Sequence, residues 1–366
     1  MKKAIAILII GAVLIGGYFV LNKRQGPKDA SPIRIGAILP MSGDFAIFGE
    51  AINKGALIAV EEAKQEGINI EYIVEDDRST AVGSINAASK LVGTDKVQGV
   101  ITATVQEVKP VAPIFTSSGI PLVAVWDSND YIKSAGSNIF TIGFSTEGSG
   151  YKMANYAKNN LKLAKIAVIA QEDEWSSLIA SAFERKFKEL GGSVVVSEKI
   201  LPTQKDFRTT LAKIKSAGVD GIYFPFLPST ISPFVRQTRE LGINAVLMTG
   251  DSISSDEVAQ AGKDAENLYF TNLYANNTKD LEAKYQAQFG SETSDITFVS
   301  FGYDGVRTLL EAVRISKKEG VSVSEAMRKV NIQGLDRKIN FEGKQYSEKL
   351  EHLYKVTDGE FVEVEQ

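Results

Sequence analysis

The side chains that most often do chemistry are scarce in this sequence of 366 residues. It contains no cysteine and one histidine, His352. The lack of cysteine rules out disulfides, thiol nucleophiles and zinc or iron–sulfur sites held by cysteine. One histidine leaves almost no room for a histidine-based metal site or a catalytic triad. No phosphate-binding loop of the type G-x-x-x-x-G-K-[ST] or G-x-G-x-x-G follows a predicted strand. We therefore expect neither an enzyme nor a bound cofactor or metal.

The chemistry that remains is ligand binding through acidic and aromatic side chains. Trp126 and Trp175, which are the only two tryptophans, and Asp251 each come shortly after a predicted strand. A carboxylate in a closed cleft with little water is costly unless it is paired, so Asp251 would favour a cationic ligand group. Indole rings bury apolar or planar ligands and stabilise cations through their π faces. The plainer alternatives are that Asp251 caps the following helix and that the tryptophans pack in the core.

Two acidic clusters also follow predicted strands. Glu75-Asp76-Asp77 has the composition of a catalytic carboxylate pair or a hard-cation site, but we interpret it as a cap for the helix that begins near residue 80. The acidic residues of 171–174 are interpreted as a solvated loop. Neither cluster therefore predicts a metal centre.

Two successive stretches of alternating strands and helices would position these residues. Apolar strands are predicted at 33–39, 68–74, 97–101 and 120–125, and again at 165–169, 193–200, 221–226 and 245–249. Such alternation is typical of parallel βαβ units. Ligands bind at the carboxyl ends of parallel strands and in clefts between lobes. The later helices, near 279–289, 297–318 and 322–330, and the strands at 350–356 and 361–364 are too few for a third domain. We expect them to complete the first two.

The N-terminus has the pattern of a membrane-targeting segment. Residues 4–22 carry no charge and lie between two pairs of basic residues. A secretory apolar region is about 7–15 residues long and a spanning helix needs about 17–25. We therefore expect an uncleaved anchor, with a cleaved signal as the alternative, and a short tether up to residue 32. In either case the rest of the chain would be exported.

Short sequence pieces along residues 33–360 occur in an order that resembles a known family. They are Ile33–Gly43, Phe48-Gly49, Gly55-Ala56, Asp76-Asp77, Gly119–Pro121, Asp206-Phe207, Asp220–Tyr223, Arg236–Gly242 and Phe301–Asp304. Together they resemble periplasmic solute-binding proteins of the leucine/isoleucine/valine-binding type, the receptors of ABC importers. The resemblance implies an α/β fold with two Rossmann-like lobes, each with a parallel sheet, joined by a three-segment hinge with the ligand cleft between them. By analogy, lobe 1 holds 33–145 and 273–339, and lobe 2 holds 146–272 and 340–366.

The resemblance also implies which residues touch the ligand. Ser128 falls on a hydroxyl that helps hold a ligand carboxylate, and Asp251 falls on the acidic residue that receives a ligand ammonium group. A second family serine is replaced by Val105 or Gln106, and Trp126 replaces a small residue; both departures put simple amino-acid recognition in question. The predicted ligand-binding residues are Phe48, Gln106, Trp126, Ser128, Trp175, Phe226, Asp251 and Phe298.

The function that the resemblance implies is a non-catalytic, extracytoplasmic receptor. The leading ligand is a branched-chain or other apolar amino acid, with a related amine or amide as the competitor. We expect permease subunits and the membrane as partners and a monomeric protein. The net charge of −4 argues against nucleic acid. A membrane-tethered sensing domain of the same fold is the alternative.

Overall fold

The structure is a computed structural model that describes residues 31–43, 45–272, 278–291, 293, 296–335, 337–347 and 351–364. The predicted anchor or signal at residues 4–22 lies outside this part of the chain. Among the described residues, no helix combines the length and the apolar composition needed to cross a membrane.

The first lobe is built on a five-stranded parallel sheet with the order β2-β1-β3-β4-β6. The strands are β1 (Ile33–Leu39), β2 (Ile70–Asp76), β3 (Gly99–Thr102), β4 (Leu122–Ala124) and β6 (Ile139–Thr141). The helices between them are α2 (Ala46–Gln65), α3 (Ala81–Lys90) with a π-helical turn (Leu91–Asp95), α4 (Val105–Ser118) and α5 (Ile132–Ala135). The chain order reverses between β1 and β3, and such a switch point opens a crevice at the carboxyl edge of a sheet.

The second lobe repeats this arrangement and adds a hairpin. Its sheet has the order β9-β8-β10-β11-β12-β15-β16. The strands are β8 (Lys165–Gln171), β9 (Ser193–Ile200), β10 (Gly221–Tyr223), β11 (Val246–Thr249), β12 (Tyr269–Asn272), β15 (His352–Thr357) and β16 (Glu360–Glu363). The first five are mutually parallel and the last two are antiparallel. The helices are α6 (Thr146–Asn159), α7 (Glu174–Glu189), α8 (Arg208–Ala217), α9 (Ile231–Glu240) and α10 (Ser255–Ala261), followed by a 3-10 turn (Gly262–Ala265). The predicted α/β class with two lobes of parallel sheet is confirmed.

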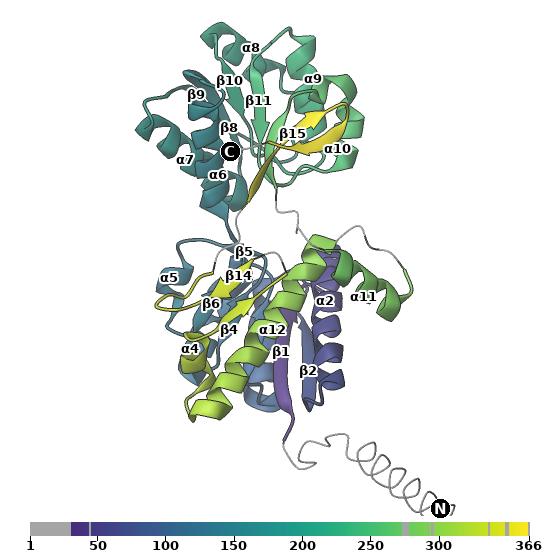
Figure 1. The fold of residues 1–366 in the computed structure, drawn as a ribbon. Coiled ribbons are helices and arrows are strands. Elements are labelled where there is room, and N and C mark those ends of the chain that lie inside the picture. The colour runs from purple at the N-terminus through teal and green to yellow at the C-terminus, as the bar shows by residue number, and fades with distance from the viewer. Residues whose placement is uncertain are drawn as a thin grey trace, which may run out of the picture.

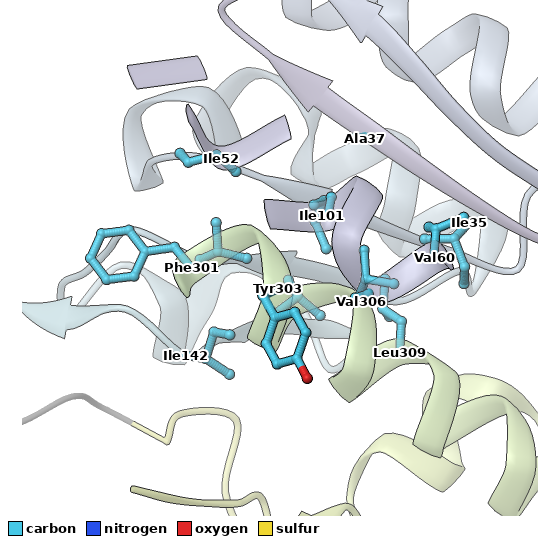
Figure 2. Close-up of a cluster of buried hydrophobic side chains, with 14 of the residues drawn as sticks. Ile35, Ala37, Ile52, Val60, Ile101, Ile142, Phe301, Tyr303, Val306 and Leu309 are labelled. Carbon is cyan, nitrogen blue, oxygen red and sulfur yellow. The ribbon is translucent and has the colours of Figure 1, made fainter. Parts of the chain in front are cut away.

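The late helices return to the first lobe. Figure 1 shows α12 (Ile296–Glu319) lying along α2 and β1. The two helices touch through glycines, because a Cβ atom on Gly302 would lie 1.8 Å from the carbonyl oxygen of Ile52. Val306 and Leu309 of α12 meet Ile35 of β1 in the core of the lobe, which Figure 2 shows. The remaining elements of this segment are α11 (Lys279–Phe289), α13 (Val323–Met327), β13 (Asn331–Gln333) and β14 (Lys338–Asn340).

The last return to the second lobe lies later than the sequence predicts. Phe341 packs on Phe140 of the first lobe with ring centroids 5.3 Å apart. The main-chain N–H of Ser347 donates to Thr141 at 2.9 Å. The predicted boundary at residue 340 is therefore several residues too early, because the edge strand β6 continues to hold the chain by main-chain hydrogen bonds.

Candidate ligand-binding site

Loops that follow strands of both lobes meet where the lobes join. Lys109 of α4 in lobe 1 forms an ion pair with Glu174 at the start of α7 in lobe 2. Burial raises the pKa of Asp127, which follows β4 in lobe 1, and the charge of Asp251, which follows β11 in lobe 2, raises it further. The ion pair and this charge effect indicate that the strand ends of the two lobes face one another, at the position where a two-lobed α/β protein binds its ligand.

Three predicted site residues form one aromatic cluster in lobe 1. Phe48, Trp126 and Phe298 come from α2, from the loop after β4 and from α12. Their ring centroids lie 5.1 Å apart for Phe48 and Trp126, 4.7 Å for Phe48 and Phe298, and 4.8 Å for Trp126 and Phe298. All three are half-buried. The cluster therefore offers ring surface for an apolar or cationic group.

Asp251 and Trp175 lie together in lobe 2. The Trp175 ring packs over Gly250, where a Cβ atom would lie 3.4 Å from it. Burial raises the pKa of Asp251 to about 6, although hydrogen bonds from its own main chain and from the Trp175 side chain favour the ionised form. Its Oδ1 atom is buried and has no hydrogen-bond partner among the described residues. The helix cap for α10 is Ser254, which accepts a hydrogen bond from the Glu257 N–H, so Asp251 is free of the capping role considered above.

The other three predicted residues differ in their surroundings. Ser128 is buried in β5 (Asp127–Ser128). This short strand pairs with β7 (Phe144–Ser145), where the chain first passes from lobe 1 to lobe 2. Gln106 is exposed in the first turn of α4. Phe226 is fully buried and packs on Phe234 with centroids 5.0 Å apart. Its ring is enclosed by other rings of the lobe 2 core and has no polar atom that needs a partner, so Phe226 is not used in the site proposed below.

Two carboxylates that the sequence analysis did not single out occupy the start of α4. Glu107 Oε2 accepts hydrogen bonds from the N–H groups of Ala103 at 2.9 Å and Thr104 at 3.0 Å. Asp127 Oδ1 accepts the Val105 N–H at 2.6 Å. Free N–H groups at a helix N-terminus form an anion site, and here the protein's own side chains fill it. The Thr-x-x-Glu spacing of 104–107 is a capping-box signature, so sequence reasoning had a signal for Glu107.

The acidic cluster Glu75-Asp76-Asp77 at the end of β2 has a structural role. Asp76 Oδ1 accepts hydrogen bonds from the Met41 and Ser42 N–H groups at 3.0 and 3.1 Å. The cap of α3 is Thr80, whose hydroxyl accepts the Gly83 N–H, so the acidic residues do not cap this helix themselves. Within the described ranges, no group of three or more histidine or acidic side chains is arranged to hold a metal ion.

The fold and the site together define a two-lobed α/β binding protein, with acidic and aromatic groups gathered where the lobes join. The chain belongs to the periplasmic binding protein family, whose model matches residues 32–357. It is 30% identical over 66% of its length to the Leu/Ile/Val-binding protein homolog 3 of Brucella melitensis, of which it covers 67%. It is 27% identical over 85% of its length to the Leu/Ile/Val-binding protein BraC3 of Rhizobium johnstonii, of which it covers 90%.

A solved structure gives the same result. The leucine-binding protein LivK of Thermotoga maritima superposes with a TM-score of 0.75 at 26% identity, covering 91% of this chain and 98% of that one. The resemblance noted in the sequence is therefore confirmed. The family consists of extracytoplasmic solute-binding receptors and not of enzymes.

The buried carboxylates predict that the free protein loses stability as the pH rises. Burial is the main cause that raises the pKa of Asp251 to about 6, of Asp127 to about 7 and of Glu107 to about 8. A carboxyl group whose pKa is higher in the folded state stabilises the fold fully below its unfolded pKa of about 4, and this contribution is lost as the pH rises through the folded value. We expect the melting temperature to fall by at least about 3 °C between pH 5 and pH 8 in calorimetry.

The variant Asp127→Asn should reduce this pH dependence, because it removes one of the titrating groups and keeps an oxygen for the Val105 N–H. The exposed residue Asp256 provides the control, since Asp256→Asn should leave the slope unchanged. A melting temperature that is constant or rises between pH 5 and pH 8 would show that these carboxylates are not desolvated as described.

Proposed function

We propose that this protein is the receptor of an ABC importer and that its two lobes close around a small ligand with a cationic nitrogen and an apolar body. The observation that carries the proposal is Asp251, a carboxylate with a buried, unpartnered oxygen at the junction of the lobes. A ligand N–H donor would supply the missing hydrogen bond, and charged hydrogen bonds are the stronger ones.

The aromatic side chains support the proposal that the ligand has an apolar body. Trp175 lies beside Asp251 in lobe 2, and the cluster of Phe48, Trp126 and Phe298 lies in lobe 1. Closure would bring ring surface from both lobes onto an apolar group. The relatives that are named as Leu/Ile/Val-binding proteins support an apolar amino acid, and a related amine satisfies the same groups. A related amide would supply the N–H donor without the charge.

The remaining parts of the proposal concern the setting of the protein. The closed form would dock on permease subunits in the membrane, and the chain would act as a monomer outside the cytoplasm. Residues 4–22 would hold it at the membrane surface if they are not cleaved. The family membership supports the transport role and the extracytoplasmic setting.

Tryptophan fluorescence tests the proposed function directly, because the sequence has two tryptophans and both belong to the proposed site, one in each lobe. Titration with a library of amino acids, amines and amides should change the emission and raise the melting temperature for at least one class of compound. Single Trp126→Phe and Trp175→Phe variants assign the change to a lobe. If no compound changes either signal, and small-angle scattering shows no closure, the receptor function is contradicted.

A further inference from the structure

A second carboxylate lies at the same edge of lobe 2 as Asp251. Glu351 immediately precedes β15, and the first residue of that strand, His352, pairs with Asn272 at the end of β12. Because β15 runs antiparallel to β12, its start lies at the carboxyl edge of the parallel strands. Asp251 follows β11, the neighbour of β12 in the same sheet. Both acidic side chains therefore belong to the edge that faces the junction of the lobes.

Glu351 is buried without a hydrogen-bond partner for its carboxylate. Its exposed fraction is 5%, and neither carboxylate oxygen is hydrogen-bonded to another described residue. The hydroxyls of Ser149 and Thr271 lie near the carboxyl group and favour its ionised form, but they are hydrogen-bonded to each other at 2.5 Å. The ammonium group of Lys152 donates to the main-chain oxygen of Glu351, and its charge also favours the ionised form. A buried carboxylate without a partner is costly, so its presence needs a reason beyond the packing of the lobe.

Two more unpartnered atoms lie close to Glu351. Asp251 Oδ1 and the hydroxyl of the fully buried Tyr223 have no hydrogen-bond partner in the described part of the chain. Burial raises the pKa of Tyr223 well above its usual range, and the charges of Glu351 and Asp251 raise it further. Burial also raises the pKa of Glu351 well above its usual range, with the charge of Asp251 as the next cause. Tyr223 ends β10, the neighbour of β11, so the three side chains gather at the carboxyl edge of the same sheet.

The facing part of lobe 1 is unsuited to a ligand carboxylate. The N–H groups of residues 103–105 at the start of α4 are already hydrogen-bonded to Glu107 and Asp127. A ligand carboxylate placed there would find these donors occupied and would meet two acidic side chains. Like charges at close range disfavour such binding.

We propose that the cleft binds an organic cation that has no carboxylate group, and that Asp251 and Glu351 together accept hydrogen bonds from its N–H donors. An ammonium, amidinium or guanidinium head group has the charge and the several donors that two neighbouring carboxylates require. The apolar remainder of the ligand would lie against the aromatic cluster of lobe 1. This inference rests on the proposed function and narrows its class of ligand.

Matched compounds with a shared carbon skeleton test the inference on the unmodified full-length protein. One set is L-leucine, isoamylamine and isocaproate, and another is L-phenylalanine, phenethylamine and hydrocinnamate; a panel of amidines and guanidines extends them. Affinities are measured by calorimetric and fluorescence titration. We expect the tightest compounds to be cations without a carboxylate, bound at least about tenfold tighter than the amino acid of the same skeleton. We expect the acids without a nitrogen not to bind.

The variant Glu351→Gln tests whether Glu351 is the second carboxylate that binds the cation. It should weaken binding of the best cation at least about tenfold, because the amide cannot become the anion that pairs with the ligand. The melting temperature of the free protein should be unchanged or higher, because a neutral amide replaces a buried carboxyl group of the same size. A purely structural Glu351 would instead lose stability on substitution and leave affinity unchanged. Glu360→Gln, an exposed change on the same C-terminal hairpin, should alter neither property.

The possible outcomes separate this inference from the proposed function. Tighter binding of an amino acid than of its matched amine overturns the inference and leaves the receptor role intact. Unchanged cation affinity in Glu351→Gln also overturns it. Saturable binding of Mg²⁺ or Ca²⁺ alone that displaces the organic cations would assign the carboxylates to a metal and overturn it as well. If no compound in the panel binds, the proposed function fails together with the inference.

Discussion

Asp251→Asn is expected to abolish ligand binding more completely than any other single change at the site. The substitution keeps the size of the side chain and removes the charge that a cationic ligand requires. Loss of one partner from a buried charged hydrogen bond costs about 2–5 kcal/mol, and we expect an affinity loss of about a hundredfold or more. Titration by calorimetry, with the best ligand of the unmodified protein, measures it.

The control for this variant is Asp256→Asn, five positions along the chain in the first turn of α10. Asp256 is exposed, so its substitution should leave affinity within about twofold of the unmodified protein. The free Asp251→Asn protein should be at least as stable as the unmodified one, since a desolvated carboxylate has been neutralised. Unchanged affinity in Asp251→Asn would show that the ligand does not contact this residue.

Gly302→Ala is expected to have the largest effect on stability. A Cβ atom at this position would lie 1.8 Å from the carbonyl oxygen of Ile52 and 2.9 Å from the main-chain nitrogen of Ala56. Both contacts are with the backbone of α2, which cannot move aside as a flexible side chain can. Overpacking of this kind costs about 3 kcal/mol, which for a chain of this size lowers the melting temperature by about 4 °C.

Gly93→Ala is the matched control, because a Cβ atom there meets nothing within 4 Å and the glycine does not have a positive φ. Its melting temperature should be unchanged or slightly higher, as alanine reduces the entropy of the unfolded chain. Equal melting temperatures for Gly302→Ala and Gly93→Ala would contradict the account. They would show that α12 does not pack on α2, and that residues 296–319 do not complete the first lobe.

The repeated strand–helix pattern was sufficient to predict most strands of both sheets, although not β6, and the return of the late helices. Parallel strands that are buried on both faces give short apolar runs, such as Ile33–Leu39 and Lys165–Gln171, which are easy to recognise. Short elements such as β5 and β7, which have two residues each, gave no such pattern. The point at which the chain finally returns to lobe 2 was also missed, because it depends on tertiary contacts of Phe341 and Ser347 with lobe 1.

Sequence reasoning selected residues for the candidate site only where the residue type itself was unusual. Trp126, Trp175 and Asp251 follow strands and are unusual enough to notice. Glu351 lies in a charged stretch of sequence, and only the pairing of β15 with β12 brings it to the edge that carries Asp251. Periodicity within a short segment contains no information about such long-range pairing.

Phe226 shows the opposite error. It ends an apolar run that begins at Tyr223, and such a run does not separate side chains that face a cleft from those that face the core. The ring of Phe226 stacks on Phe207 and makes edge contacts with Phe224 and Phe234. These three side chains come from the start of α8, from directly after β10 and from α9 of the same lobe. Only the packing of α8 and α9 on the sheet could have shown this.

A crystal structure of the protein with its tightest ligand tests the central claim most directly. The account predicts a ligand enclosed between the lobes, with a nitrogen atom within hydrogen-bond distance of the carboxylates of Asp251 and Glu351 and its apolar part against Trp175 or the aromatic cluster of lobe 1. A ligand bound elsewhere on the surface, or one whose carboxylate occupies the start of α4 with Asp127 displaced, would contradict it.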